Sequence, residues 1–240
     1  MPNKRIVIKF SGEVMGQART QTNFDFQQIK ALAQALKKLV ESDYQIGVVI
    51  GGGNIFRGRM IKNMEIAAVT ADFMGMLATM MNALALKGVL EKLGQRAVVM
   101  SPFGCTSVWE PYSAAHAKKL LDYKNILIFS GGTGKPHFTT DTALVLRAMQ
   151  IGAQQIFKAT NVAGVYSSDP QKNKKAKFYK NLTYQQAMKK HLKVMDASAF
   201  KMAAKNNLSL TVFKYSPSNL AKAVRGLNLG TQVSNARRQS

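Results

Sequence analysis

Residues 51–58 read GGGNIFRG and directly follow an apolar run at residues 47–50. Three glycines at the end of a buried strand let the backbone approach a ligand closely and turn its N–H groups toward it, which is how many chains bind phosphate. Arg57 stands in the same segment, and its fixed fork of donors suits a phosphate better than a lysine would. The segment therefore predicts a phosphate-binding loop.

Two further glycine-bearing segments follow predicted strands. Residues 9–13 read KFSGE, so Lys9 closes a strand beside a small Ser-Gly pair; it either supplies a cation for a phosphoryl group or faces solvent. Residues 130–141 read SGGTGKPHFTTD and lead into a helix whose predicted cap is Thr139 or Thr140. Hydroxyls, free N–H groups and one carboxylate together suit a nucleotide or its ribose.

Neither glycine segment matches a standard nucleotide fingerprint. A Gly-x-Gly-x-x-Gly frame begun at Gly51 puts Phe56 in the last glycine position. Gly134-Lys135 resembles the end of a P-loop, but Pro136 stands where Ser or Thr is needed. Neither a dinucleotide-binding loop nor a P-loop is therefore predicted.

Two more polar segments could complete the site. Around residues 157–170 a strand ends with a lysine and a threonine, and Tyr166 and Asp169 follow in a turn. An adenine could pack near Tyr166 while Asp169 takes ribose hydroxyls; the alternatives are ordinary packing for the tyrosine and an ordinary Asp-Pro turn. Asp196 stands at a predicted helix start, where it is either a functional carboxylate or simply an N-cap.

Short apolar runs alternate with helical periodicity along the chain. This alternation predicts an α/β fold, a three-layer αβα sandwich around a mainly parallel sheet. Ligands of such sheets collect beyond the carboxyl ends of the strands, where the polar segments stand. The predicted strands are residues 5–10, 46–50, 97–100, 126–129, 155–158 and 208–213, and the predicted helices are residues 26–40, 65–93, 114–121, 140–149, 184–190, 196–206 and 219–225.

Length and composition fit one large domain or two fused halves, since 240 residues at 46% hydrophobic content support a substantial core. The N-terminus has no signal-like apolar stretch, so secretion is not expected. Cys105, the single cysteine, offers neither an intrachain disulfide nor a metal cluster, which suits a reducing cytoplasm. The apolar region at residues 66–90 could be read as a membrane span, but Asp72, Asn82 and Lys87 interrupt it. A buried or subunit-contacting helix is predicted instead.

The charge is strongly positive, with 34 Lys and Arg against 12 Asp and Glu, a formal net charge of +22 and a pI near 10.2. Such a field attracts anions, so the partners should be negative. Lysines concentrate at residues 172–180. A solvated lysine-rich surface is the favoured reading, and binding of nucleic acid or an anionic surface stays open, although no nucleic-acid motif supports it.

The complete set of segments resembles the bacterial uridylate (UMP) kinases of the amino acid kinase superfamily, in one register over residues 4–230. The glycine loop and Lys9 are shared across that superfamily, which includes aspartate, glutamate, acetylglutamate and carbamate kinases. Residues 72–79, DFMGMLAT, and residues 133–141 favour UMP as the acceptor. The resemblance implies transfer of the ATP γ-phosphoryl group to UMP with Mg²⁺, giving UDP and ADP, in cytoplasmic pyrimidine nucleotide biosynthesis.

The resemblance also implies roles for individual residues. Residues 1–150 would form the UMP-binding and phosphoryl-transfer half of a single domain, and residues 151–240 the ATP-binding half. No residue is assigned to a metal, since phosphate oxygens and water would carry Mg²⁺. The implied catalytic residues are Lys9, Arg57 and Asp196, with Asp196 orienting Lys9; the ATP-binding residues are Lys9, Phe10, Ser11, Gly12, Gly53, Arg57, Lys158, Thr160, Tyr166 and Asp169; and the UMP-binding residues are Gly52, Asp72, Thr133, Gly134, Lys135, Pro136, His137, Phe138, Thr139, Thr140 and Asp141.

Assembly and regulation follow from the same resemblance. It implies a homohexamer with the methionine-rich helix between subunits, activation by GTP and inhibition by UTP, and no membrane partner. Residues 16–25 lack the glycines of relatives whose loop is tied to GTP activation, which argues against GTP control. Lys135, His137 and Ala71 depart from the family pattern in the UMP segments and bear on acceptor affinity. Two alternatives remain, a weakened paralogue that senses nucleotides and a basic nucleic-acid-binding protein on a kinase scaffold.

Overall fold

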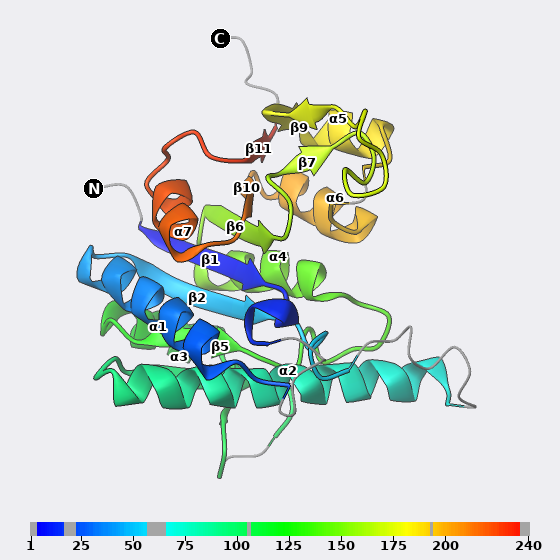
Figure 1. Ribbon diagram of the computed structural model, residues 1–240. Coiled ribbons are helices and arrows are strands. Elements are labelled where there is room, and N and C mark those ends of the chain that lie inside the picture. The colour runs from blue at the N-terminus through cyan, green and yellow to red at the C-terminus, as the bar shows by residue number, and fades with distance from the viewer. Residues whose placement is uncertain (1–3, 17–22, 57–65, 105–106, 193, 236–240) are drawn as a thin grey trace.

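The computed structural model describes residues 4–16, 23–56, 66–104, 107–192 and 194–235 (Figure 1). In these residues strands and helices alternate along the chain, as the sequence predicted. The predicted three-layer α/β architecture with a mainly parallel sheet is confirmed.

The central sheet contains nine strands within the described residues, in the order β4-β3-β5-β2-β1-β6-β10-β11-β9. All neighbouring strands are parallel except β10 and β11. The two outer strands, β4 and β9, are short. The sheet strands are β1 Arg5–Phe10, β2 Gln45–Ile50, β3 Ala97–Ser101, β4 Glu110–Pro111, β5 Ile126–Phe129, β6 Gln155–Thr160, β9 Asn181–Thr183, β10 Ser209–Lys214 and β11 Thr231–Ser234, and a separate hairpin pairs β7 Val165–Tyr166 with β8 Phe178–Tyr179.

Helices cover both faces of the sheet, with α1 and α7 on the near face in Figure 1. Alternate residues of β1 enter opposite cores: Ile6 and Ile8 pack toward α1, α2 and α7, whereas Val7 packs toward α3, α4 and α6. Burial on both faces explains why the central strands read as continuous apolar runs. The helices are α1 Phe26–Glu41, α2 Ala68–Lys92, α3 Ala114–Asp122, α4 Thr140–Ile151, α5 Tyr184–Lys189, α6 Ala197–Lys205 and α7 Pro217–Val224, with a short 3₁₀ turn, η1, at Gly12–Val14.

Side-chain caps fix where several helices begin. Asp25 accepts hydrogen bonds from the backbone N–H groups of Gln27 and Gln28 at the start of α1. Thr139, one of the two predicted caps, accepts from the backbone N–H of Asp141 at the start of α4. Such caps satisfy backbone donors that have no partner inside the helix. The cap of α4 also sets the position of the polar segment that precedes it.

The predicted elements are all present, with shifted ends. The strand expected at residues 208–213 is β10 Ser209–Lys214, and the helix expected from residue 196 begins at Ala197, because Asp196 is its N-cap. Residue 65, the expected start of the long helix, lies outside the described residues. Five strands were not predicted, because each has two to four residues and none contains an apolar run of four: β4, β7, β8, β9 and β11.

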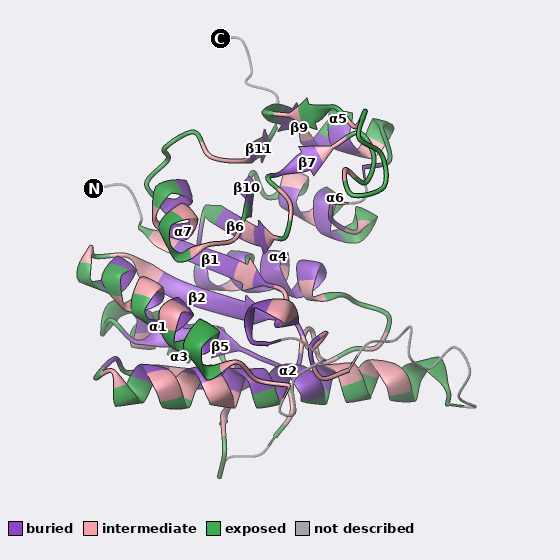
Figure 2. Ribbon diagram, viewed as in Figure 1, coloured by how far each residue is buried: buried purple, intermediate pink, exposed green. Residues whose placement is uncertain are grey.

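The long helix α2 is the one described helix that is apolar and long enough to cross a membrane. It packs against α1 and β3, and 44% of its most apolar stretch of 18 residues is buried. Figure 2 shows buried residues along this helix. The interrupting Asn82 is fully buried, and its side chain bonds to the loop after β2. The helix therefore belongs to the folded core. An apolar row remains exposed along it, formed by Val69, Phe73, Leu77 and Met81.

Candidate active site

The loops that follow the carboxyl ends of β1, β2, β5 and β6 meet around one cavity of about 570 Å³. This first cavity brings together predicted residues from both halves of the chain. Ligand sites of parallel sheets form at this edge. The predicted residues that line it are Lys9, Ser11, Gly12, Gly52, Gly53, Asp72, Phe138, Thr139, Thr140, Lys158 and Thr160.

Two glycines in the walls have no room for a side chain. A Cβ on Gly12 would lie 2.6 Å from the backbone nitrogen of Gly53, and one on Gly52 would lie 2.8 Å from the carbonyl oxygen of Gly75. The two backbone loops are therefore in direct contact, and their N–H groups share one small region. Beside them, the hydroxyl oxygen of Ser11 is buried without a hydrogen-bond partner in the structure. A buried unpaired hydroxyl facing a cavity is the state expected before a polar ligand binds.

A pair of buried amides holds the glycine loop against α2. Asn82 donates to the carbonyl oxygen of Gly51 at 2.7 Å and exchanges hydrogen bonds with Asn54 at 2.7 and 3.0 Å. Both side chains are at most 1% exposed. Because buried polar groups are costly unless paired, this network fixes the loop in one position.

Two lysines share one carboxylate at the base of the first cavity. Lys9 on β1 and Lys158 on β6 are partners in the parallel register of the sheet. Their Nζ atoms lie 3.0 and 2.6 Å from the two carboxylate oxygens of Asp141, and all three side chains are at most 13% exposed. The cluster keeps one net positive charge in a water-poor place, which suits a phosphoryl group.

Burial changes the proton affinity of this cluster. The pKa of Lys158 is lowered from 10.5 to about 8, mainly by burial and also by the nearby charge of Lys9, while Asp141 offsets part of this change. Lys158 also donates to the backbone carbonyl oxygen of Val194. These contacts fix the ammonium group while leaving its charge sensitive to pH.

The carboxylate that pairs with Lys9 in this structure is Asp141, and the expectation that Asp196 orients Lys9 stays a prediction. Asp196 caps α6 by accepting from the backbone N–H of Ala199 at 2.7 Å, and it accepts from Thr139 at 2.5 Å and from Ser198 at 2.6 Å. Burial raises the pKa of Asp196, but these hydrogen bonds outweigh burial and hold it below the ordinary value. Asp196 thus connects the start of α6 to the start of α4, which also carries Asp141 of the lysine cluster.

The predicted acceptor segment, residues 130–141, is shaped by left-handed glycines. Gly131, Gly132 and Gly134 have φ values of +69°, +58° and +80°. Among its described residues, Phe138, Thr139 and Thr140 reach the first cavity with Gly132, whereas Thr133, Gly134, Lys135, Pro136 and His137 do not line it, and Asp141 lies beneath it. The backbone N–H of His137 donates to Asp72 at 2.7 Å, so the segment is already docked on α2.

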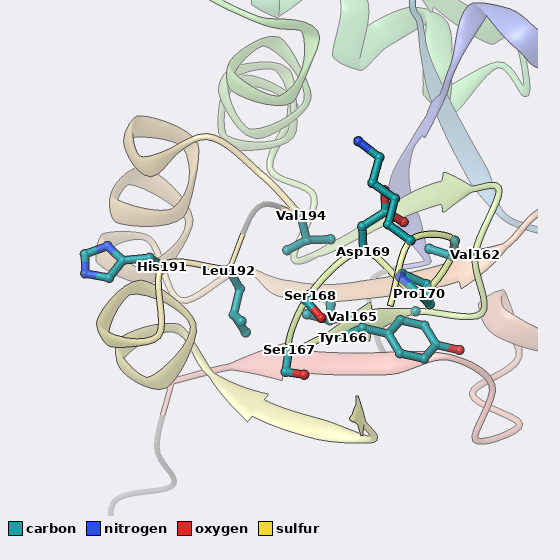
Figure 3. A pocket seen from close by; sticks show the side chains of 12 residues that line it. Val162, Val165, Tyr166, Ser167, Ser168, Asp169, Pro170, His191, Leu192 and Val194 are labelled. Atoms are coloured by element: carbon teal, nitrogen blue, oxygen red, sulfur yellow. The ribbon is translucent and has the colours of Figure 1, made fainter. Parts of the chain in front are cut away.

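A second cavity of about 650 Å³ lies beside the first and is lined by the segment after β6 and the turn after α5 (Figure 3). Tyr166 and Asp169 line it, as predicted for the adenosine end of ATP, and Lys172 does so as well. Tyr166 and Asp169 also make the packing and turn contacts that were the alternatives to nucleotide binding. The Tyr166 ring packs edge-on against Phe178 at 5.3 Å, and Asp169 accepts from the backbone N–H of Gln171 in its turn at 2.9 Å. Thr160 lines the first cavity and not this one.

Phe10, predicted to bind ATP, lines neither cavity. The side chain of Phe10 is fully buried in the core against Tyr215, and only its carbonyl oxygen serves the site, by accepting from the N–H of Gly51 at 2.9 Å. The Phe10 side chain is therefore part of the core, and the assignment of Phe10 to the ATP-binding residues stays a prediction. Arg57 lies outside the described residues, and its role stays a prediction.

Several residues of the first cavity were not predicted. Glu13, in the 3₁₀ turn, accepts a hydrogen bond from Asn161 after β6, and this contact joins the two sides of the cavity. Glu13 stood in a segment already chosen from the sequence, so it could have been found. Met76 and Thr79 also line the cavity; they belong to the motif at residues 72–79, but only Asp72 of that motif was given a role.

No group of three or more His, Cys, Asp or Glu residues within the described ranges could hold a metal ion. The carboxylates that line the first cavity are Glu13 and Asp72.

The model of the amino acid kinase family matches residues 4–214. The chain is 44% identical over 231 residues to uridylate kinases of Yersinia enterocolitica and Yersinia pestis, covering 96% of this chain and 93% and 95% of theirs. Among solved structures, it resembles UMP kinase of Bacillus anthracis with a TM-score of 0.93 and 35% identity, over 98% of this chain and 97% of that one. It also resembles UMP kinase of Ureaplasma parvum with a TM-score of 0.91 and 36% identity, over 98% and 100% of the two chains.

Proposed function

The chain belongs to the amino acid kinase family, and from that premise we propose that it is a UMP kinase, which transfers the ATP γ-phosphoryl group to UMP and releases UDP and ADP. The observation that carries the proposal is the position of the Lys9–Asp141–Lys158 cluster. It lies at the base of a cavity that also holds two glycine loops and the carboxylate of Asp72. The lysines and the backbone N–H groups of the loops therefore line the same cavity as Asp72, whose carboxylate suits a ribose.

The reaction needs positioning and charge stabilisation and no covalent nucleophile. The ATP phosphates would lie along the N–H groups of Gly12 and Gly53 and the hydroxyl of Ser11, with the adenosine end toward Tyr166 and Asp169 in the second cavity. Lys9 and Lys158 would face the transferring phosphoryl group and stabilise the charge that develops on its oxygens. Arg57 is proposed to add a donor fork to the same phosphates.

UMP would occupy the other side of the first cavity, between α2 and the acceptor segment. Asp72 would accept ribose hydroxyls, Gly52 would let the acceptor approach closely, and Thr139 and Thr140 would supply hydroxyl contacts. An acceptor held there has its phosphate directed toward the lysine cluster, which is the in-line arrangement that phosphoryl transfer requires.

A divalent metal accompanies ATP in kinases of this kind, and Mg²⁺ is the proposed ion. The residues present fit it, because Mg²⁺ is usually held by substrate phosphates, water and one or two carboxylates rather than by a protein cage. When bound it would neutralise charge on the β- and γ-phosphates. The chain's own contribution is then the pair of lysines and the N–H groups of the loops.

Assembly, location and regulation are proposed from the family membership. A homohexamer would cover the exposed apolar row of Val69, Phe73, Leu77 and Met81 on α2. Residues 1–150 would serve as the acceptor half and residues 151–240 as the ATP half of one domain, in the cytoplasm. Inhibition by UTP is proposed; residues 17–22, part of the stretch that bears on GTP control, lie outside the described residues.

The two alternative functions are not favoured. A weakened paralogue is hard to reconcile with an intact cluster of Lys9, Asp141 and Lys158. The lysines at positions 174, 175, 177 and 180 are exposed, as expected of a solvated surface.

The decisive experiment measures ADP release by the purified protein with MgATP and one acceptor at a time: UMP, CMP, dUMP, AMP, GMP and acetylglutamate. Strong turnover with UMP and weak turnover with the others is the expected result. Turnover with acetylglutamate in place of UMP would reject the proposal, and so would a lack of turnover with every acceptor.

Replacing Asp72 with asparagine is expected to raise the KM for UMP about tenfold or more, with the KM for ATP nearly unchanged. An amide is a weaker acceptor than a carboxylate, and hydrogen bonds to charged groups contribute about 1.5–3 kcal/mol. Steady-state kinetics with each substrate varied in turn checks this. Glu91→Gln is a matched control, because Glu91 lies on the same helix and pairs only with Lys87 among the described residues. Equal shifts in both KM values would contradict the role of Asp72.

The value of kcat/KM for MgATP is expected to fall as pH rises through about 8, because Lys158 then loses its proton and its charge. Lys158→Arg should remove this fall, since a guanidinium stays protonated. Stability should change in the opposite direction: between about pH 8 and 10.5 the unfolded chain binds more protons than the folded one, so the free energy of unfolding rises with pH. A pH–rate profile of parent and variant is the measurement, and a profile that stays flat through pH 8 in the parent speaks against the assignment.

A further inference from the structure

Arg147, on α4, is a buried cation that the proposed reaction does not use. It is 3% exposed, and within the described residues no carboxylate forms an ion pair with it. Burial lowers the pKa of its guanidinium, and the adjacent Tyr112 offsets part of this change. Burying a charge without an opposite charge is costly, so the contacts that hold Arg147 must be specific.

Three contacts hold the guanidinium. It lies over the face of the Tyr112 ring, 3.8 Å from the centroid, its Nη1 donates to Gln150 at 2.8 Å, and its Nη2 donates to the carbonyl oxygen of Gly132 at 3.2 Å. The ring and Gln150 fix the plane of the fork. Nη2 is then directed at the backbone of the acceptor segment, while Nε is buried with no hydrogen-bond partner among the described residues.

Gly132 is a place where one hydrogen bond can decide the backbone path. It lines the first cavity, and its φ is left-handed, as are those of Gly131 and Gly134. Among the described residues, Gly132 itself makes no hydrogen bond other than the one from Arg147. The preceding Gly131 is fixed from the other side, because its N–H donates to Thr79 of α2 at 2.8 Å. The turn is thus held between α2 and α4, with Arg147 as the contact from α4.

The same helix also ends the segment. Thr139 caps α4, and Asp141 in its first turn bridges the two lysines, while Arg147 lies two turns further along. The contact between Arg147 and Gly132 therefore ties the first residues of the acceptor segment to the helix that begins at its last residues. Both ends of residues 132–140 are fixed to one rigid element.

We propose that Arg147 is a positioning residue for the acceptor nucleotide, which sets the shape of residues 132–140 by holding the Gly132 carbonyl, with no contact to either substrate. This inference rests on the proposed UMP kinase function. It predicts a selective effect on the acceptor, since the residues assigned to ATP come from other loops.

The test replaces Arg147 with methionine, which keeps the length of the side chain and removes the donors, and with lysine, which keeps the charge and loses the fork. Arg147→Met is expected to raise the KM for UMP about tenfold and to leave the KM for ATP within about twofold, and Arg147→Lys to lie between it and the parent. Equilibrium dialysis of UMP without ATP should show the same change in affinity.

Two controls separate positioning from loss of stability. Gln150→Ala removes a partner of Arg147 but keeps the Gly132 contact, and it should leave both KM values within about twofold of the parent. Ile151→Ala opens a cavity at the far, buried end of α4 and lowers the melting temperature without touching the segment.

The outcomes separate the inference from the function on which it rests. If the parent phosphorylates UMP and the Arg147 variants shift only the KM for UMP, the inference holds. If the parent phosphorylates UMP but the Arg147 variants shift both KM values, or neither, or only lower the melting temperature as Ile151→Ala does, the inference is overturned and the function stands. If the parent has no turnover with UMP, the proposed function itself is overturned. Should Arg147→Met fail to fold, Arg147→Lys and the dialysis measurement decide in the same way.

Discussion

Lys9→Ala is expected to lower kcat by about 10²- to 10³-fold, the loss typical when one donor that stabilises a transition state is removed from a preorganised site. Lys9 lies at the carboxyl end of the central strand β1 and points its ammonium group at the base of the first cavity, 3.0 Å from Asp141. Without Lys9, only Lys158 of the two lysines would remain to stabilise the charge on the transferring phosphoryl group. The KM for UMP should change much less than kcat.

The measurement is the rate of ADP release at saturating UMP and MgATP. Lys4→Ala is the matched control, because Lys4 immediately precedes the same strand and its ammonium donates only to the carbonyl oxygen of Ser42 in the described structure. The fold should survive in Lys9→Ala, since Asp141 keeps Lys158 as a partner. A second effect is expected: the fall of kcat/KM with pH should move to higher pH, because Lys9 lowers the pKa of Lys158. Near-normal turnover would refute the role given to Lys9.

Asp141→Asn is expected to damage both turnover and stability. The substitution keeps the shape of the side chain but leaves the ammonium groups of Lys9 and Lys158 beside each other without a negative charge. Removing one partner of a buried ion pair typically lowers the free energy of unfolding by about 3–5 kcal/mol. The pKa of Lys158 should fall further, because Asp141 raises it in the parent.

Urea unfolding near neutral pH without nucleotide measures the stability loss, and the coupled assay measures turnover. Asp122→Asn is the control, since that carboxylate is 61% exposed and pairs with Arg5 at the surface; its effect should stay within about 1 kcal/mol. Saturating MgATP should restore much of the stability of Asp141→Asn, because the phosphates supply negative charge to the lysines. If unfolding of Asp141→Asn matches that of the parent, the cluster is not a coupled unit.

The parts of the fold that were predictable are those buried on both faces. The central strands consist of apolar residues because each face meets a helix layer, so a short apolar run marks them without any three-dimensional knowledge. Three strands that were missed are short and partly exposed, and they form by pairing with residues elsewhere in the chain: Phe178–Tyr179, Asn181–Thr183 and Thr231–Ser234. Such pairing leaves no local pattern in the sequence.

The same distinction applies to the site. Glycine loops and strand-end lysines could be recognised, because backbone approach to a phosphate is a local property. The partner of Lys9 could not be derived from spacing: Asp141 and Asp196 both begin helices, and which carboxylate reaches the lysine depends on how α4 lies beneath β1 and β6. Arg147 gave no signal at all, since a single arginine within a helical pattern is usually at the surface.

The two outer strands of the sheet have a consequence for how copies of this chain can meet. At one margin β4 has two residues, and one of them, Pro111, has no N–H to offer; at the other margin β9 has three. Within the described residues, neither margin offers a long template that could recruit a strand from another molecule, which protects a nine-stranded sheet from fibrillar growth. Val69, Phe73, Leu77 and Met81 on α2 offer side-chain packing instead, as an exposed apolar face. A self-complementary face of this kind closes an assembly at a finite size, whereas an open strand margin favours aggregates without a defined size.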